Sequence, residues 1–197
     1  MTARTGMTEI ISDLRVLTEA GASEWILGNI TFWDDAQLQN ILDKHREDFV
    51  FQPLEAKPVY GTGGTVIYKE YEVEEYENLE QTTGGTSIFY IQNGNFDTAG
   101  TALYTMDYRR GRVYFTDNQI GAYYYATGRS YDLNSAAAEV WRIKANHYAT
   151  NFDFSTDNHS VKKSQVYDHC IERAEYFEGM SENGVVQAHI SRSDDVG

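Results

Sequence analysis

The sequence is poor in cysteine, in basic residues and in long apolar runs. Cys170 is the only cysteine among 197 residues, which excludes an internal disulfide and a multi-cysteine metal site. Lysine and arginine total 16 against 30 aspartates and glutamates, giving a net charge of −14. Nucleic-acid-binding proteins and proteins that adhere to anionic membranes carry basic surfaces instead. We therefore expect no specific binding to DNA and no attachment to a membrane.

Two further absences concern targeting. No apolar stretch reaches the roughly 18 residues that a membrane-spanning helix needs. Residues 1–14, MTARTGMTEIISDL, lack the apolar centre of a secretory signal peptide. Hydrophobic residues make up 41% of the chain, which is ordinary for a folded domain. The sequence thus predicts a globular protein that is made in the cytoplasm and stays there.

Tyrosine is abundant, and it is unevenly placed. Residues 51–130 contain 11 of the 15 tyrosines and 10 of the 16 glycines. The same region has short runs rich in tyrosine, valine, isoleucine, phenylalanine and threonine, which are TVIYKEYEV, TSIFYI, TALYTMDY, RVYFT and AYYYAT. Glycine-containing joints separate the runs, as in β-hairpins. The pattern predicts five or six antiparallel strands.

The region before this one has helical periodicity. Apolar residues recur between positions 10 and 17, with Thr8 as a candidate cap and Gly21 as a stop. A second helix has Asp34 as N-cap and Gln37 three residues later, which is the pattern of a capping box. Its apolar face is predicted to continue through His45 to Phe49.

Helical periodicity returns at residue 132 and again near Ser160. The first of these helices has Asp132 or Asn134 as its cap, and the second runs to about Glu178. Its expected apolar face consists of Val161, Val166 or Tyr167, Cys170, Ala174 and Phe177.

These elements predict an α+β fold. Residues 1–50 and 131–178 would form a bundle of about four helices, residues 51–130 an inserted antiparallel β-rich region, and residues 179–197 an extended C-terminal tail.

Residues typical of catalytic or metal sites do not combine into a motif. His169 precedes Cys170, but adjacent helical residues point about 100° apart, so Cys170 is interpreted as a core residue. The glycines at positions 61–64 lack the lysine of a phosphate-binding loop and are predicted to form a hairpin turn. The segment 153–157 resembles the start of a calcium loop, but Asn158 and Ser164 occupy the positions of its glycine and glutamate. The sequence therefore predicts no catalytic residue, no metal and no cofactor.

Two charge clusters are candidates for an interface. Residues 69–80 contain six glutamates, Glu74 and Glu75 among them, against one lysine. Arg109, Arg110 and Arg112 cluster at a predicted hairpin. Like charges that are crowded on a strand repel one another. The clusters are either solvated faces or complementary contacts between copies of the chain, and both interpretations stay open here.

Three consecutive tyrosines, at positions 123–125, place aromatic rings on both faces of one predicted strand. One face suffices to cover a core. Tyr123 and Tyr125 on the other face would pack under a second layer, form a protein interface or provide a carbohydrate-binding platform.

Three stretches resemble the helical regions of bacteriophage head–tail connector proteins, the adaptor or head-completion proteins of tailed phages. They are ITFWDDAQLQNILDKHRED at 30–48, TGRSYDLNSAAAEVWRIKANHYA at 127–149 and FDFSTDNHSVKKSQVYDHC at 152–170. The resemblance covers about half of the chain, mostly its helices. The tyrosine-rich insertion is larger than in the smallest adaptors.

The resemblance implies a structural virion protein at the head–tail junction, made in the host cytoplasm. Such adaptors form a ring of about twelve copies that continues the DNA channel. Its partners would be the portal protein and a tail-side neck protein (a stopper or tail terminator), and DNA would pass through without specific binding.

The C-terminal tail of such adaptors commonly reaches into the portal. Here Val186, Ala188 and Ile190 alternate with period two, which suggests a strand added to an exposed portal edge. A disordered end is the alternative.

Two other functions stay open. The first is another structural role in the virion, as a capsid decoration or tail-terminator protein. The second is that of a carbohydrate-binding module that uses its tyrosine-rich insertion.

Overall fold

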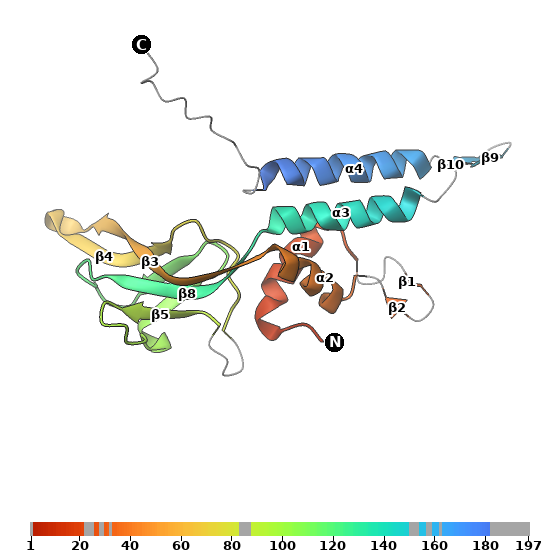
Figure 1. Ribbon diagram of the computed structural model, residues 1–197. Helices are drawn as coiled ribbons and strands as arrows, with labels where there is room; N and C mark the ends of the chain where they lie inside the picture. Colours follow the sequence, from red (N-terminus) through yellow and green to blue (C-terminus); the bar gives the residue numbers. More distant parts are fainter. Residues whose placement is uncertain are drawn as a thin grey trace, which may run out of the picture.

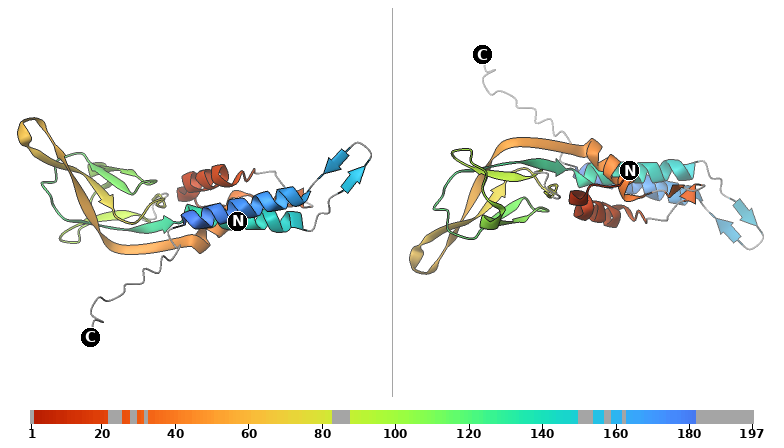
Figure 2. Two further views of the ribbon diagram at one scale, coloured as in Figure 1. Left: turned by 90° about the horizontal axis from the view of Figure 1, so that it is seen from above. Right: turned by 90° about the horizontal axis from the view of Figure 1, so that it is seen from below.

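A computed structural model describes residues 2–21, 26–27, 30–31, 33–82, 88–149, 154–156, 159–161 and 163–181. The fold is mixed α+β. The molecule is elongated, with α-helices at one end and a curled antiparallel sheet at the other (Figures 1 and 2). The chain passes between these two ends twice. It enters the sheet after the second helix and leaves the sheet before the third helix.

The described part of the chain contains four α-helices, and they share one hydrophobic core. They are α1 (Thr8–Thr18), α2 (Asp35–Leu42), α3 (Leu133–Ala149) and α4 (Lys163–Met180). α3 and α4 lie side by side along their length (Figure 1). Buried side chains from all four helices form the core, including Leu14, Leu38, Trp141, Cys170 and Phe177. Cys170 is buried there, as predicted.

The start of α2 confirms the capping box. The Asp34 side chain accepts from the Gln37 backbone N–H at 2.7 Å, and the Gln37 side chain accepts from the Asp34 N–H at 3.1 Å. Trp33 and Leu38, which flank the box, are both buried in the helical core. This local motif fixes the start of α2.

Both signals that were expected to bound α1 are wrong. Thr8 is its first residue and does not cap it, because its hydroxyl donates to the Thr5 carbonyl within the short 3₁₀ helix η1 (Thr5–Met7). The helix ends at Thr18, and Glu19 has left-handed backbone with φ of 53°. Gly21 therefore lies beyond the stop.

The helical face predicted to run from His45 to Phe49 is also wrong. α2 ends at Leu42, the 3₁₀ helix η2 covers Asp43–His45, and strand β3 begins at Arg46. Phe49 lies in the sheet core and stacks on Tyr76 with ring centroids 4.4 Å apart. Strand pairing with β8 outweighs the helical periodicity of these residues.

The main sheet has six strands in the order β5-β8-β3-β4-β7-β6, and all pairs are antiparallel. This confirms the predicted number and direction of strands. Their bounds are β3 Arg46–Tyr60, β4 Val66–Val73, β5 Tyr90–Asn93, β6 Tyr104–Asp107, β7 Arg112–Phe115 and β8 Tyr124–Tyr131. The inner face of the curled sheet holds a second hydrophobic core. Gly61 N–H donates to the Thr65 carbonyl at 2.8 Å between β3 and β4, which confirms the predicted hairpin turn.

Two small strand pairs lie outside this sheet. β1 (Ile26–Leu27) pairs with β2 (Ile30–Thr31), and β9 (Phe154–Thr156) pairs with β10 (His159–Val161). Ser160 and Val161, expected at the start of the last helix, therefore belong to a strand. α4 begins at Lys163, after this pair, and Cys170, Ala174 and Phe177 form its buried face. Val166 and Tyr167 are exposed, so that part of the expected face was wrong.

The segment 78–81 forms hydrogen bonds with two parts of the sheet and with the N-terminal part of the chain. Its backbone N–H groups donate to the carbonyls of Tyr108 and Arg109 beside β6 and of Arg129 in β8, at 2.8–3.0 Å. Gln81 N–H donates to the Gly6 carbonyl at 3.3 Å. This short segment therefore links the helical end to the sheet.

Asp132 links the start of α3 to the residue that follows α4. Its Oδ1 accepts hydrogen bonds from the backbone N–H groups of Asn134 and Ser135 at 2.9 Å, so Asp132 is the cap. Its Oδ2 accepts from the hydroxyls of Ser135 and Ser181 at 2.7 Å. Burial alone would raise the pKa of Asp132, but these hydrogen bonds outweigh it and lower the pKa.

The lowered pKa of Asp132 predicts a pH-dependent contribution to stability. The carboxylate stabilises the folded chain above its ordinary pKa of 3.8, and this contribution is lost as the pH falls, because the unfolded chain takes up the proton first. We expect Asp132→Ala to lower the free energy of unfolding by about 1 kcal/mol at neutral pH and by clearly less near pH 2. Urea denaturation of both proteins measures the difference. An equal difference at both pH values would contradict the assignment.

Candidate functional site

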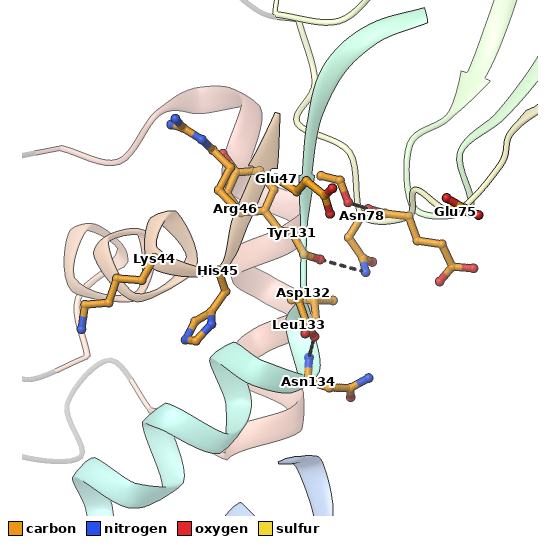
Figure 3. Close-up of a pocket in the computed structure, with 12 residues that line it drawn as sticks. Lys44, His45, Arg46, Glu47, Glu75, Asn78, Tyr131, Asp132, Leu133 and Asn134 are labelled. Carbon is orange, nitrogen blue, oxygen red and sulfur yellow. Dashed lines mark hydrogen bonds between the residues drawn. The ribbon is translucent and has the colours of Figure 1, made fainter. Parts of the chain in front are cut away.

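A hollow lies where the helical end meets the sheet (Figure 3). This junction pocket has a volume of about 420 Å³. It is lined by η2, the start of β3, the loop before Asn78, the end of β8 and the start of α3, and Asn78 donates across it to the Tyr131 carbonyl at 3.4 Å. Its acidic and basic residues are Lys44, His45, Arg46, Glu47, Glu75, Glu77 and Asp132.

The basic groups of the junction pocket already have acidic partners. Lys44 forms an ion pair with Glu139, and His45 Nε2 lies 3.0 Å from the same carboxylate. Arg46 Nε lies 2.9 Å from Asp48 Oδ1. Burial would raise the pKa of Glu139, but hydrogen bonds from Lys44 and His45 lower it. The basic groups of the pocket are therefore already occupied, and the four carboxylates of its lining outnumber them.

Beside the junction pocket lies a buried ionic network centred on Glu80. The Glu80 side chain is fully buried, and its carboxylate accepts from Arg4 Nε at 2.8 Å and from the Tyr131 hydroxyl at 2.6 Å. Arg129 Nη1 lies 3.4 Å from it. These residues come from the N-terminal segment, the 78–81 segment and β8.

Arg4 extends this network to the helices. Its guanidinium donates two hydrogen bonds to the Asp43 carboxylate, at 2.9 and 2.6 Å. The pair raises the pKa of Arg4 and lowers the pKa of Asp43, so both groups stay charged. Every charge of the network is paired, and we interpret it as the structural joint between the two ends of the molecule.

A different kind of surface lies on the outer face of β5, β8 and β3. A bulge in β3 between Phe49 and Gln52 turns Phe51 outward, with φ of 53° and the side chain 47% exposed. Phe96, in the turn after β5, has φ of 65° and is 58% exposed. Its ring centroid lies 5.6 Å from Phe51 and 5.9 Å from Tyr125. We call the residues Phe51, Pro53, Phe96, Tyr123 and Tyr125 the aromatic face.

The backbone conformation of Phe51 and Phe96 is unusual for bulky residues. Left-handed backbone is uncommon for side chains of this size and is found where the surrounding structure imposes it, often at functional sites. Bulges likewise reorient side chains. Two such distortions converge here on one exposed group of rings, which makes the aromatic face the best candidate for a functional surface.

Tyr124 and Tyr125 lie on opposite faces of β8, as predicted, whereas Tyr123 precedes the strand. Tyr124 points inward, with its ring 4.5 Å from that of Phe115 and its hydroxyl donating to Gln119 at 2.6 Å. Tyr125 stacks on Phe96 on the outer face, and Tyr123 is 79% exposed. No described residue forms a second layer over Tyr123, so an interface or a carbohydrate platform stays a prediction for it.

The two predicted charge clusters meet each other within the chain. Arg112 lies 3.3 Å from Glu70 and 3.7 Å from Glu72 on the neighbouring strand β4. Arg109 forms an ion pair with Asp13 of α1. The strand pairing therefore neutralises part of both clusters inside one molecule.

Three further members of the charge clusters, Arg110, Glu74 and Glu75, are exposed. They have no ion pair with another described residue and stay candidates for contact with a partner. The candidate tail residues Val186, Ala188 and Ile190 lie outside the described residues, as do Asp153, Asp157 and Asn158 of the calcium-loop comparison.

Sequence reasoning missed Phe51 and Phe96. Phe51 follows Phe49 by two residues, which in a regular strand would place both on one face, and only the bulge separates them. The signal for Phe96 was an apolar residue within the turn sequence Asn-Gly-Asn-Phe-Asp.

Two searches of the described residues bear on other functions. No group of three or more histidine, cysteine, aspartate or glutamate side chains there is arranged to hold a metal ion. None of the helices in those ranges has the length and apolar character needed to cross a membrane. The chain matches no protein-family model, and no curated protein is significantly similar to it.

Proposed function

We propose that this chain is a structural protein of a phage virion, a head–tail adaptor that forms a ring between the portal and the tail. In this proposal the four helices form the bundle of the adaptor, the sheet is its insertion, and the chain after α4, which ends at Met180, is its extended tail. The ring has about twelve copies, as in the adaptors that the helical sequences resemble. It is assembled in the host cytoplasm and contacts the portal on one side and a tail-side neck protein on the other.

The aromatic face is the observation that carries the proposal. Exposed tyrosine and phenylalanine rings are typical of protein–protein interfaces, where large apolar groups leave water. Phe51 and Phe96 keep a costly backbone conformation while their rings remain in solvent. Contact with another protein would bury these rings. The basic groups of the junction pocket, in contrast, already bind carboxylates of the same chain, which favours a structural role for them over catalysis.

The charge balance supports the same role. A net charge of −14 repels phosphates, so DNA would pass through such a ring without adhering to it. A strong, salt-sensitive affinity of the purified chain for duplex DNA would contradict this part of the proposal.

The decisive experiment combines the purified chain with the portal protein of the same phage and examines the mixture by electron microscopy. We expect a ring of extra density on the tail side of the portal. A variant with Phe96→Asp and Tyr123→Asp should lose at least about tenfold in ring occupancy, since it places charge on the aromatic face. Val16→Asp, an exposed change on α1, is the matched control. Density on the capsid lattice, or no density with the unmodified chain, would reject the adaptor assignment.

One observation favours a second candidate, a carbohydrate-binding module. Phe96 and Tyr125 stack with an angle of 25° between their planes, and an exposed aromatic platform is also a surface on which sugar rings pack. A glycan array on which the chain and the Tyr125→Ala variant give the same background signal would remove this candidate.

A further inference from the structure

A second uncharged apolar surface lies at the end of the β3–β4 hairpin. We call residues 59–66, with the sequence VYGTGGTV, the hairpin tip. Tyr60 and Val66 are directly paired across the two strands, and Tyr60 is 76% exposed. The hairpin tip projects beyond the other strands at the end of the molecule away from the helices (Figure 2). It is therefore accessible to another molecule from several sides.

The hairpin tip and the aromatic face share their chemistry. The hairpin tip contains no charged residue, and the aromatic face consists of uncharged residues with one exposed acidic neighbour, Asp97, beside Phe96. Both expose valine, tyrosine or phenylalanine side chains. Copies of a protein with a net charge of −14 repel one another, so they associate best through surfaces that carry no charge. A partner with a strong charge of either sign has nothing to pair with on these two surfaces.

One molecule cannot bring the two surfaces together. Phe51 and Tyr60 lie on the same strand, β3, nine residues apart, which at the usual rise corresponds to about 30 Å. The pairing of β3 with both β4 and β8 keeps the strand extended within the sheet. A hairpin tip that covers an aromatic face must therefore belong to a second copy.

We infer that the hairpin tip of one copy docks on the aromatic face of the next copy. Tyr60 and Val66 would pack against the rings of Phe96 and Tyr125, and the tyrosine hydroxyls would remain at the rim in contact with water. Two different surfaces on each copy make this contact heterologous, and heterologous contacts generate rings when the rotation closes. The inference rests on the proposed adaptor function for its closed ring, and it names the surfaces that hold the copies together.

The inferred contact also accounts for the backbone of the aromatic face. In a regular strand, Phe51 would lie on the same face of β3 as the buried Phe49. The bulge at Val50 and Phe51 instead places the Phe51 ring beside the Phe96 ring. The left-handed conformations of Phe51 and Phe96 keep both rings in place before a partner arrives. Such preorganisation reduces what must be ordered on binding.

Thiol crosslinking tests the contact directly, because the native Cys170 is buried and reacts slowly. Full-length Tyr60→Cys and Phe96→Cys proteins are mixed at high concentration and treated with a short bismaleimide. We expect the mixture to give at least about tenfold more crosslinked dimer than a control mixture of Tyr60→Cys and Val16→Cys. Val16 is 76% exposed on α1, so its thiol is equally accessible but lies outside the proposed contact.

The outcomes separate the possible arrangements. The inference is supported if the Tyr60→Cys and Phe96→Cys mixture gives dimer and if Tyr125→Asp, added to the Phe96→Cys protein, lowers the dimer yield to the control level. Equal yields of crosslinked dimer in the test and control mixtures overturn the inference. A higher dimer yield from Phe96→Cys alone than from the mixture also overturns it, because this result indicates a symmetric pairing of aromatic faces.

Failure of the inference is distinguishable from failure of the adaptor function. Density at the portal without the specific crosslink keeps the adaptor function and rejects these two surfaces. The specific crosslink without density at the portal keeps the contact between copies and rejects the adaptor function.

Discussion

Replacing Glu80 by alanine is expected to lower the free energy of unfolding by about 3 kcal/mol. The carboxylate is fully buried and binds Arg4, Arg129 and the Tyr131 hydroxyl. Its removal takes one carboxylate from Arg4, which keeps Asp43, and from Arg129, which keeps Asp48. It also leaves the O–H of the buried Tyr131 without its acceptor, and an unsatisfied buried donor costs more than a lost surface contact. Urea denaturation followed by circular dichroism measures the change.

Two other substitutions in the same region provide controls. Glu77→Ala, an exposed change in the loop that leads to Glu80, should alter the free energy of unfolding by less than about 0.5 kcal/mol. Tyr131→Phe removes one hydrogen bond to Glu80 but keeps the ring, and should destabilise by about 1 kcal/mol. A Glu80→Ala protein as stable as the Glu77→Ala protein would show that the network does not join the two ends of the molecule.

The second large effect concerns Gly111, in the turn between β6 and β7. Its φ of +64° is unfavourable for any residue with a Cβ, and an added Cβ would lie 2.4 Å from the Tyr76 carbonyl oxygen. Because that oxygen belongs to the backbone, either the loop around Tyr76 or the turn at Gly111 must move. We expect Gly111→Ala to lower the free energy of unfolding by about 3 kcal/mol, from the conformational cost and the displacement together.

Gly63 separates these two contributions. It has a φ of +82°, but an added Cβ meets no atom within 4 Å. Gly63→Ala should therefore show the conformational cost alone, about 1 kcal/mol. Thermal denaturation of the two variants compares them under the same conditions. Equal destabilisation of both variants would mean that the contact with Tyr76 has no energetic consequence.

Features of the fold that depend on neighbouring residues could be predicted from the sequence. The capping box of Asp34 and Gln37 depends on residues three apart, and it lies where the spacing placed it. The hairpin at residues 61–64 depends on glycine conformations within one turn. The opposite faces of Tyr124 and Tyr125 follow from the twofold period of a strand.

Features that depend on distant partners could not be predicted. Residues 46–49 continue the helical period of α2, and only their pairing with β8 makes them a strand. Glu80 was one of six glutamates in an acidic run, and nothing local distinguished it. Its partner Arg4 lies 76 positions away in the sequence. Of the aromatic face, only Tyr123 and Tyr125 were predicted. Phe51 was missed because the residue types do not reveal the bulge that turns it outward.

The helical core is assembled from both ends of the chain, and this determines when folding can be completed during synthesis. The Trp141 side chain donates to the Leu17 carbonyl across 124 positions, at 3.3 Å. Until α3 and α4 have been synthesised, the apolar faces of α1 and α2 can pack only against each other. The β3–β4 and β6–β7 hairpins, in contrast, bring together residues that are close in the sequence, and such local contacts form early. We therefore expect the sheet hairpins to form while the ribosome is still at work, whereas the helical core is completed only when the last helix is released.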